Sequence, residues 1–329
     1  MKKLISSSIL ALSVAGLSAH ALADTIRVTS QLPETHPVSQ NWLEFGKLVK
    51  EKTGGELSVQ LFPSAQLFKD KEVPEAVGSG AIDAGSTFIG RFAGSVPAVD
   101  VIAVPFIFND EAHIRASVAP GSDLRKAIDS KILEETNARV LWWQAYGRNV
   151  YLSNGDAIVE PSDIEGKKIR TYGKVHGWTA EALNGAPTLL SGSKQFLAYQ
   201  QGAVDVGMTG ASAVKSRKLF EVMDNMTLTF DSAIEFLAVI NNDVYEGLSE
   251  QEQAAVMDAA RVVEQQLRNR VYAEEAQTVE EMKQYMNVVE LTDAQRAAWQ
   301  QATQTVVDRF VKETGETGAE AVSAIRSVQ

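Results

Sequence analysis

A ten-residue pattern that occurs twice constrains the fold of this chain more than any other feature of its sequence. Residues 76–85 read AVGSGAIDAG and residues 198–207 read AYQQGAVDVG, so six of ten positions agree in identity or type at an offset of 122. Thr87 and Thr209 are separated by the same offset and are therefore equivalent positions of the repeat. Each copy predicts a helix ended by glycine, a short buried strand, and a glycine-led loop with a threonine. An offset this long is not a solenoid period, so we expect two related α/β domains; the alternative is chance similarity of a common helix–Gly–strand unit.

The segments around the copies predict alternating strands and helices. Strands are expected over residues 25–30, 57–62, 81–84, 140–143 and 236–240. A helix is expected from Ser39 to a stop at Thr53–Gly55, and another over residues 72–77. This order is typical of an α/β fold whose sheet is covered on both faces. The strand at 236–240 follows the second copy, so the chain is expected to cross between domains more than once.

The last third of the chain predicts a helix too long for one small domain. Ser249–Glu252 forms a capping box, and neither proline nor glycine follows before about Tyr285. A helix of roughly 35 residues is about 50 Å long, so it should lie across both domains. A final helix is expected from Thr292 to near Gly315. The apolar stripe predicted for the long helix consists of Ala255, Ala259, Val262, Val263, Leu267, Val271 and Ala276.

The amino terminus predicts export. Met1–Lys3 is charged, the apolar run Leu4–Leu17 is too short to span a bilayer, and Ala21–Ala23 matches a cleavage site of small residues. We therefore expect residues 1–23 to be a cleaved signal peptide and the mature chain to be periplasmic. The net charge of −11 becomes more negative when two lysines are removed with that segment. This charge argues against nucleic acids and anionic membranes as partners.

Patterns that carry enzymatic chemistry are absent from the sequence. It has no cysteine, and the histidines of the expected mature chain, His36, His113 and His176, lack metal-ligand spacing. There is no phosphate-binding loop, no dinucleotide fingerprint and no G-x-S-x-G motif. We expect no catalytic residue, no metal and no cofactor, and a protein that is not an enzyme.

The segment Ile164–Arg170, with the sequence IEGKKIR, predicts a turn at Gly166 and a short strand that carries Arg170 to its end. A guanidinium binds a carboxylate through two parallel hydrogen bonds, a geometry that lysine does not reproduce. The alternative is a surface arginine that follows a basic turn. Arg148 likewise comes soon after the strand predicted over residues 140–143.

Taken in order, these segments resemble the extracytoplasmic solute-binding receptors of tripartite ATP-independent periplasmic (TRAP) transporters, of the dicarboxylate-receptor type. The resemblance implies a two-domain, periplasmic-binding-protein-like fold with a cleft between the domains and a long C-terminal helix spanning both. It also implies a receptor that captures a small organic acid anion by hinge closure and delivers it to TRAP membrane subunits. The matching segments cover essentially the whole mature chain: His36–Pro37, Lys52–Gly55, Phe62–Leu67, Gly80–Asp83, Pro105–Phe108, Ile164–Arg170 and Gly202–Asp205.

The resemblance also implies roles for individual residues. It implies that Arg170 binds the carboxylate of the ligand and that Arg148 assists in this binding. Many family members have a glutamate–asparagine pair where this chain has Met208–Thr209. Thr209 therefore replaces a ligand-binding asparagine, and the ligand cannot be copied from the sialic-acid or four-carbon dicarboxylate receptors. The other candidate ligand contacts are Thr87, Phe88, Arg91, Tyr172, Trp178 and His36, for which core, rim or solvated positions are the alternatives.

The expected domain division assigns residues 24–145 plus about 235–270 to domain I, and residues 146–234 plus about 271–329 to domain II. We expect a monomer. Two other functions stay open at this point. One is a solute-binding protein of another importer class (ABC-type), for which two short helices would replace the single long one. The other is an exported hydrolase or lyase.

Overall fold

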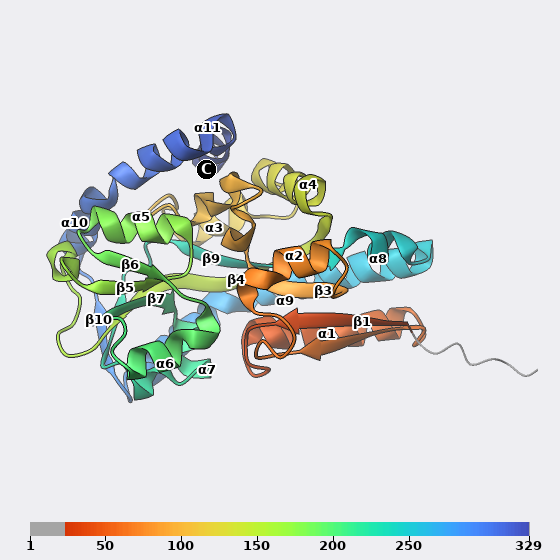
Figure 1. The fold of residues 1–329 in the computed structure, drawn as a ribbon, viewed down its shortest axis with the longest axis horizontal. Helices are drawn as coiled ribbons and strands as arrows, with labels where there is room; N and C mark the ends of the chain where they lie inside the picture. Colours follow the sequence, from red (N-terminus) through yellow and green to blue (C-terminus); the bar gives the residue numbers. More distant parts are fainter. Residues whose placement is uncertain (1–23, 329) are drawn as a thin grey trace, which may run out of the picture.

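The computed structural model describes residues 24–328 as an α/β protein in which strands from distant parts of the chain pair with one another (Figure 1). The strand order is β2-β1-β3-β9-β4-β7-β5-β6, and β8 pairs with both β4 and β10. The expected signal peptide, residues 1–23, lies outside the described residues. The strands are β1 (Asp24–Ser30), β2 (Leu57–Phe62), β3 (Ala84–Phe88), β4 (Ala138–Ser153), β5 (Lys168–Thr171), β6 (Ala186–Leu189), β7 (Val206–Gly210), β8 (Asn225–Leu228), β9 (Ala233–Asn241) and β10 (Asn287–Glu290).

Two units of the same topology flank the antiparallel pair β4–β9. In the first unit, β1 lies between two parallel partners, β2 and β3, and β3 pairs with β9 in antiparallel fashion. In the second unit, β5 lies between parallel β6 and β7, and β7 pairs with β4 in antiparallel fashion. Figure 1 shows the first unit on the right and the second on the left, with β4 and β9 running between them. The two-domain α/β fold is therefore confirmed.

The sequence repeat marks equivalent positions in these units. Helix α2 (Val73–Gly78) precedes β3, and helix α6 (Gln195–Gln200) precedes β7, with both helix and strand bounds at the same offset as the repeat. Gly80 and Gly202 follow these helices at positive φ, 76° and 62°, a conformation that glycine adopts without steric cost.

The aspartates of the repeat make the same contact in both units. The Asp83 carboxylate accepts a 2.8 Å hydrogen bond from the backbone N–H of Arg27 in β1. The Asp205 carboxylate accepts one of 2.8 Å from the backbone N–H of Lys168 in β5. Each aspartate thus ties the turn before β3 or β7 to the neighbouring parallel strand.

The repeated strands begin later than the sequence predicted. The sequence predicted a strand over residues 81–84 and a loop over residues 85–88, whereas the observed strand β3 covers Ala84–Phe88. This strand is buried along its whole length and pairs with a neighbouring strand on each edge. Thr87 in β3 and Thr209 in β7 therefore lie within strands and not in loops. Small residues such as Gly85 leave room for the helix above the strand, since a Cβ at this position would lie 2.6 Å from Val73 Cγ1.

Helix α9 begins at the predicted capping box, with Ser249 as its N-cap, and has 33 residues. It packs against α1 (Pro37–Lys52) of the first unit, against β4, and against α7 (Ala211–Ser216) of the second unit, so the single helix spans both units as predicted (Figure 1). The helices not yet given are α3 (Glu111–Ser117), α4 (Asp123–Thr136), α5 (Lys174–Ala182), α8 (Asn242–Gly247), α9 (Glu250–Met282), α10 (Asp293–Thr303) and α11 (Thr305–Arg326).

The buried face of α9 differs from the predicted apolar stripe. Val262 is 39% exposed and Ala276 is also exposed, whereas Glu264, Arg268 and Glu275 are buried. These charged side chains enter the interior because buried partners compensate them. The Arg268 guanidinium, for example, donates to both carboxylate oxygens of Glu235 at 2.8 and 3.0 Å.

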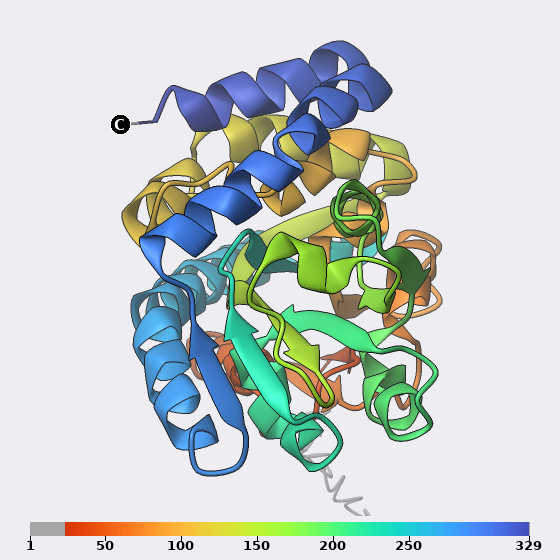
Figure 2. The same ribbon diagram turned by 90° about the vertical axis from the view of Figure 1, so that its left-hand side faces the viewer.

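The helical C-terminus extends beyond the predicted end near Gly315. Gly315 has φ 66°, which bends the chain, and α11 continues to Arg326. Figure 2 shows α10 running diagonally up to α11, whose last part lies along the top of the molecule, above α3 and α4. Helix α11 contacts α4 and the short helix η3 (Pro97–Ala103) as well as α5 of the second unit. Within residues 24–328, no helix combines the length and the apolar character that crossing a membrane requires.

Strand β4 carries core residues for both units. Trp142, near its start, packs against Trp42 and Phe45 of α1, with ring centroids 4.6 and 4.7 Å away. Tyr151, near its end, packs against Trp299 of α10 at 5.1 Å. All five rings are almost completely buried. The crossing strand is therefore anchored at both ends, and the candidate site lies between these anchors.

Candidate functional site

A cavity lies between the two units, at the carboxyl ends of their parallel strands. This is the edge of an α/β sheet at which ligands generally bind. Strands β1 and β3 of the first unit and β5 and β7 of the second all end there. The lining residues are Gln31, Asp70, Phe88, Arg91, Tyr146, Arg170, Tyr172, Gly192, Thr209, Gly210, Arg217, Ile234 and Phe236. Five of the nine ligand contacts predicted from the sequence are among them: Phe88, Arg91, Arg170, Tyr172 and Thr209.

Arg170 is the central cation of this cavity. It lies on β5, behind the predicted turn at Gly166, and only 3% of the residue is exposed. Its Nε and Nη2 donate to the Leu190 carbonyl at 3.1 and 2.9 Å, and its Nη1 donates to the Met208 carbonyl. These bonds use three of the five N–H groups of a guanidinium and leave two for a ligand.

No carboxylate within residues 24–328 forms an ion pair with Arg170. Burial lowers the pKa of Arg170 to about 10, and the nearby charges of Arg217 and Arg91 act in the same direction. The guanidinium is still protonated at neutral pH. A buried cation without a counter-charge is costly, so the site favours the entry of an anion.

Arg91, in the short helix η2 (Ile89–Phe92), is a second cation of the cavity, and it is paired. Its Nε donates to the fully buried carboxylate of Asp70. The same carboxylate accepts from Thr87 Oγ1 at 2.9 Å and from the Phe88 backbone N–H at 3.2 Å. Thr87 therefore does not line the cavity but fixes the carboxylate that holds Arg91. Asp70 belongs to the charged run Lys69–Glu72, which the sequence does not distinguish from a solvated surface segment.

Arg217 is a third cation, which sequence analysis missed. It follows α7, and its Nη1 donates to Gln195 Oε1 at 2.7 Å. Among the described residues, its buried Nη2 has no hydrogen-bond partner. The surrounding sequence, Lys215-Ser216-Arg217-Lys218, has the composition of an exposed basic turn, and only its place in the fold brings Arg217 to the cavity.

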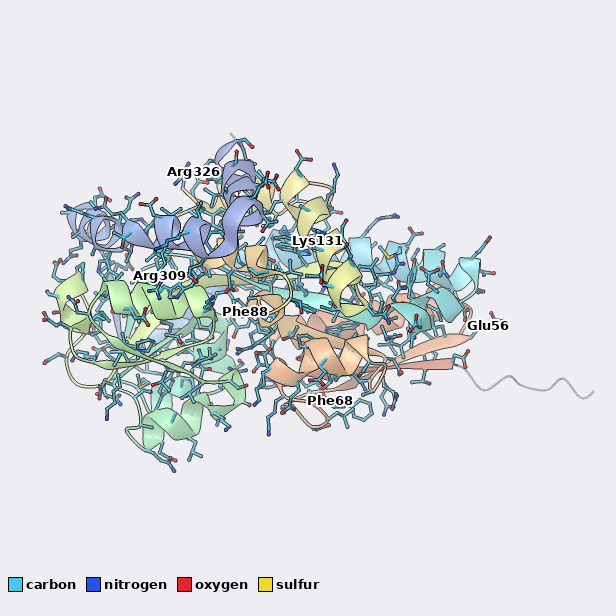
Figure 3. The ribbon with its side chains drawn as sticks, turned by 45° about the horizontal axis from the view of Figure 1, so that its top comes forward. Glu56, Phe68, Phe88, Lys131, Arg309 and Arg326 are labelled. Atoms are coloured by element: carbon cyan, nitrogen blue, oxygen red, sulfur yellow. The ribbon has the colours of Figure 1, made fainter. Side chains whose placement is uncertain are left out.

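Aromatic rings enclose the cavity from both units. Phe88 of β3 lies edge-on to Tyr172 across the units, with ring centroids 5.1 Å apart, and Figure 3 shows Phe88 near the middle of the molecule. Tyr146 stacks on Phe236 at 5.1 Å. The Tyr172 hydroxyl donates to Asn149 Oδ1 at 3.0 Å. Burial raises the pKa of both tyrosines, so their hydroxyls stay neutral and add no charge to the cavity.

Hydrogen bonds join the two units beside the cavity. His36 Nδ1 accepts from the Val38 backbone N–H and caps α1, which leaves Nε2 to donate to Ser212 Oγ at 3.1 Å in the second unit. Ser191 Oγ donates to Gln31 Oε1 at 3.3 Å. Burial, with a smaller effect of the Arg217 charge, lowers the pKa of His36 to about 3. The His36 ring lies 4.7 Å from that of Tyr146, directly behind the lining.

The structure does not bring Arg148 or Trp178 into the lining. The Arg148 guanidinium forms an ion pair with Glu275 of α9 at 2.7 Å and lies 3.7 Å from the Phe230 ring centroid. Trp178 of α5 lies between Lys174 and Arg309, whose charged groups are 4.9 and 4.7 Å from its ring. Trp178 and Arg309 thereby join α5 to α11, in the region where Figure 3 labels Arg309.

Comparisons with known proteins find related sequences and structures along nearly the whole chain. The family model described as "bacterial extracellular solute-binding protein, family 7" matches residues 28–314. The 2,3-diketo-L-gulonate-binding periplasmic protein YiaO of Escherichia coli (strain K12) is 30% identical, over 97% of this chain and 98% of its own. The C4-dicarboxylate-binding periplasmic protein DctP of Rhodobacter capsulatus is 26% identical, over 96% and 95%. Among solved structures, a TRAP periplasmic solute-binding protein from Polaromonas sp. JS666, bound to D-erythronate, is 26% identical with a TM-score of 0.86, over 93% of this chain and 99% of that chain.

Proposed function

Because this chain belongs to family 7 of the bacterial extracellular solute-binding proteins, we propose that it captures a small organic acid anion between its two units and delivers the anion to TRAP membrane subunits. The chain is a solute-binding receptor of the TRAP type and not an enzyme, as the sequence predicted. Its relatives are named for, or bound to, 2,3-diketo-L-gulonate, C4-dicarboxylates and D-erythronate, all of which are organic acids. These names support an acid as the ligand here.

The observation that carries the proposal is the buried guanidinium of Arg170, which has no counter-charge among the described residues and keeps two N–H groups free. A carboxylate matches this arrangement because its two oxygens accept parallel hydrogen bonds. Arg91, Thr209, Phe88 and Tyr172 complete the proposed contacts. Thr87 acts through Asp70, and Arg148, Trp178 and His36 act through the packing around the cavity.

Hinge closure is the proposed mode of binding. The contacts between His36 and Ser212 and between Gln31 and Ser191 form only when the units approach each other. Strands β4 and β9 cross between the units and are suited to bend there. We retain the domain division at residues 24–145 plus about 235–270 and residues 146–234 plus about 271–329. We also propose that residues 1–23 direct export into the periplasm and that the protein is a monomer. The single long helix α9 favours the TRAP type over the ABC-type alternative.

Arg170 variants test this function. Wild type, Arg170→Ala and Arg170→Lys are titrated with 2,3-diketo-L-gulonate, D-erythronate and succinate, with thermal shift and calorimetry as the measurements. We expect at least one acid to raise the melting temperature of wild type. Arg170→Ala should abolish that rise, since losing the charge-assisted pair costs on the order of 3 kcal/mol. Arg170→Lys should bind weakly, because an ammonium lacks the planar fork.

The control is Arg261→Ala on α9, whose side chain is 71% exposed and pairs with Asp258 at the surface. It should bind like wild type. Without ligand, Arg170→Ala should melt close to wild type, because losing its hydrogen bonds to carbonyl groups is offset by removing an uncompensated buried charge. Unchanged binding by Arg170→Ala would contradict the assignment of Arg170.

A further inference from the structure

A buried chain of hydrogen bonds runs from Asp231 to the cavity. Asp231 Oδ1 accepts from Asn149 Nδ2 at 2.8 Å, and Asn149 Oδ1 accepts from the Tyr172 hydroxyl at 3.0 Å. Asp231, Asn149 and Tyr172 are 4%, 0% and 5% exposed. Tyr172 lines the cavity, whereas the other two residues lie behind it. A ligand in the cavity would therefore contact only the last member of this chain.

The carboxylate fixes the direction of each bond in the chain. An ionised carboxylate accepts hydrogen bonds but does not donate them, so Asn149 must turn its NH₂ group toward Asp231. The carbonyl oxygen of Asn149 then faces Tyr172, and the tyrosine hydroxyl must donate. Thr229 Oγ1 also donates to Asp231 Oδ1, at 2.8 Å. Burial raises the pKa of Asp231, and the hydrogen bonds from Asn149 and Thr229 oppose that shift. Asp231 thereby sets the orientation of a hydroxyl that is two hydrogen bonds away.

The turn that carries Asp231 has a strained backbone. Phe230 has φ 45°, in the left-handed region that a residue with a side chain enters only at an energetic cost. The Phe230 backbone N–H donates to the Asn149 carbonyl at 3.0 Å. On the other side of the turn, Arg296 Nη1 of α10 donates to the Thr229 carbonyl at 2.8 Å. These bonds compensate the strain and keep Asp231 opposite Asn149. Strain of this kind is concentrated at functional sites.

The ring of Tyr172 lies at the boundary between the two units. Its centroid is 5.3 Å from Arg170 Cζ in the second unit and 5.1 Å from the ring of Phe88 in the first. The hydroxyl is the polar group of this side chain, so anchoring it fixes the ring relative to both neighbours. A ring that shifts would change the shape of the cavity and the surroundings of the Arg170 guanidinium.

We propose that Asp231 is a positioning residue for ligand binding, which orients the Asn149 amide and thereby holds the Tyr172 ring in the wall of the cavity. This role rests on the proposed function, because it assumes that the ligand binds in the cavity that Tyr172 lines. Asn149 lies on β4, and Asp231 lies just before β9. The chain of hydrogen bonds therefore ties the cavity wall to both strands that cross between the units.

A double-mutant cycle tests this role. Wild type, Asp231→Asn, Tyr172→Phe and the double variant are titrated by calorimetry with 2,3-diketo-L-gulonate, D-erythronate and succinate. Asparagine has the shape of aspartate, but its NH₂ group lets the Asn149 amide turn over. We expect each single variant to bind the best of these acids about tenfold more weakly than wild type, the effect of one lost hydrogen bond. The double variant should bind no more weakly than Tyr172→Phe, because Asp231 acts through the tyrosine hydroxyl.

Two further variants separate this role from a loss of stability. Thr229→Val removes a different donor to the same carboxylate. It should lower the melting temperature but bind the acid within about threefold of wild type, because the link through Asn149 is intact. Asn149→Ala breaks the chain at its middle and should reproduce the affinity loss of Asp231→Asn, so the test does not depend on one variant. A purely structural role predicts instead that affinity follows the melting temperature in all variants.

A measurement without ligand follows the hydroxyl itself. NMR of the protein with isotope-labelled tyrosine detects hydroxyl protons that exchange slowly with water, and Tyr172→Phe assigns the signal of Tyr172. This signal should be present in wild type and in Thr229→Val, and it should be lost or shifted in Asp231→Asn.

The outcomes distinguish the two proposals. If Asp231→Asn binds like wild type, if its effect adds to that of Tyr172→Phe, or if the Tyr172 signal is unchanged, the positioning role is wrong and the proposed function stands. If none of these acids binds wild type, the proposed function fails and the positioning role fails with it.

Discussion

The carboxylate of Glu275 on α9 accepts hydrogen bonds from both the backbone N–H and the guanidinium of Arg148 on β4. Glu275 Oε1 accepts from the Arg148 backbone N–H at 2.6 Å, and Oε2 accepts from Arg148 Nε at 2.8 Å. The residue before, Gly147, has φ 125°, and a Cβ there would lie 2.6 Å from Glu275 Oε1. The β4–β9 register shifts between Ala145 and Gly147. The buried carboxylate thus fixes the irregular point at which β4 passes from one unit to the other.

Replacing Glu275 with glutamine should destabilise the folded chain. Glu275→Gln keeps the size of the side chain and one acceptor for the Arg148 backbone N–H, but it removes the negative charge opposite the guanidinium. A hydrogen bond between charged groups contributes roughly 1.5–3 kcal/mol, and the Arg148 side chain is 27% exposed. We therefore expect the free energy of unfolding to fall by about 2 kcal/mol in urea titrations at neutral pH.

Glu274→Gln is the matched control, one position away on the same helix. Glu274 pairs with Arg270 at 3.3 Å, and both side chains are exposed. Exposed pairs contribute little, so the control should stay within about 0.5 kcal/mol of wild type. Equal stability of the two variants would show that the Arg148 contact does not stabilise the crossing.

His36 should make the folded chain sensitive to acid. Burial lowers its pKa to about 3, below its ordinary value of 6.5. As the pH falls below 6.5, the unfolded chain binds a proton at His36 and the folded chain does not, so stability is lost as pH falls through this window. The slope for one such histidine is about 1.4 kcal/mol per pH unit.

The measurement compares wild type with His36→Asn, since asparagine also caps helices but does not titrate. A direct comparison is needed because burial raises the pKa of Asp100 to about 7, and this group makes stability fall as pH rises over the same range. Between pH 6.5 and 5, wild type should lose roughly 2 kcal/mol of unfolding free energy relative to His36→Asn. Parallel pH profiles for the two proteins would mean that His36 titrates normally in the folded state.

The sequence predicts the regular part of this molecule because local signals determine it. Strand β2 has the predicted bounds, and α9 begins at the predicted capping box, since proline, glycine and capping residues act on their immediate neighbours. The position of Arg170 could be predicted from the sequence because a turn at Gly166 and a short strand precede and contain it. The repeat predicts equivalent strands although it places their starts too early.

The sequence does not predict which charged residues are buried. Asp70 and Arg217 lie in charged runs, and Glu275 lies on a helix face that reads as solvated. Their burial depends on partners far along the chain, such as Gln195 for Arg217 and Arg148 for Glu275. Arg148 was predicted to assist ligand binding, whereas in the structure it contacts α9. Only the fold determines these pairings.

Gly207 should tolerate no side chain, because Tyr199 lies against it. A Cβ at position 207 would lie 2.0 Å from Tyr199 Oη and 2.5 Å from Cζ, and Tyr199 is 2% exposed. Overpacking of a buried position costs about 1–3 kcal/mol, so Gly207→Ala should lower the free energy of unfolding by that amount. Gly94→Ala is the control, since nothing lies within 4 Å of a Cβ at Gly94.

A double variant, Gly207→Ala/Tyr199→Phe, tests whether the Tyr199 hydroxyl causes the loss of stability expected for Gly207→Ala. Tyr199→Phe alone should cost about 1 kcal/mol for the lost hydrogen bond to Gln195. In Gly207→Ala/Tyr199→Phe the nearest clashing atom is gone, so the double variant should be more stable than the sum of the single effects by at least about 0.5 kcal/mol in urea titrations. Additive effects would mean that the new methyl group meets something other than the tyrosine hydroxyl.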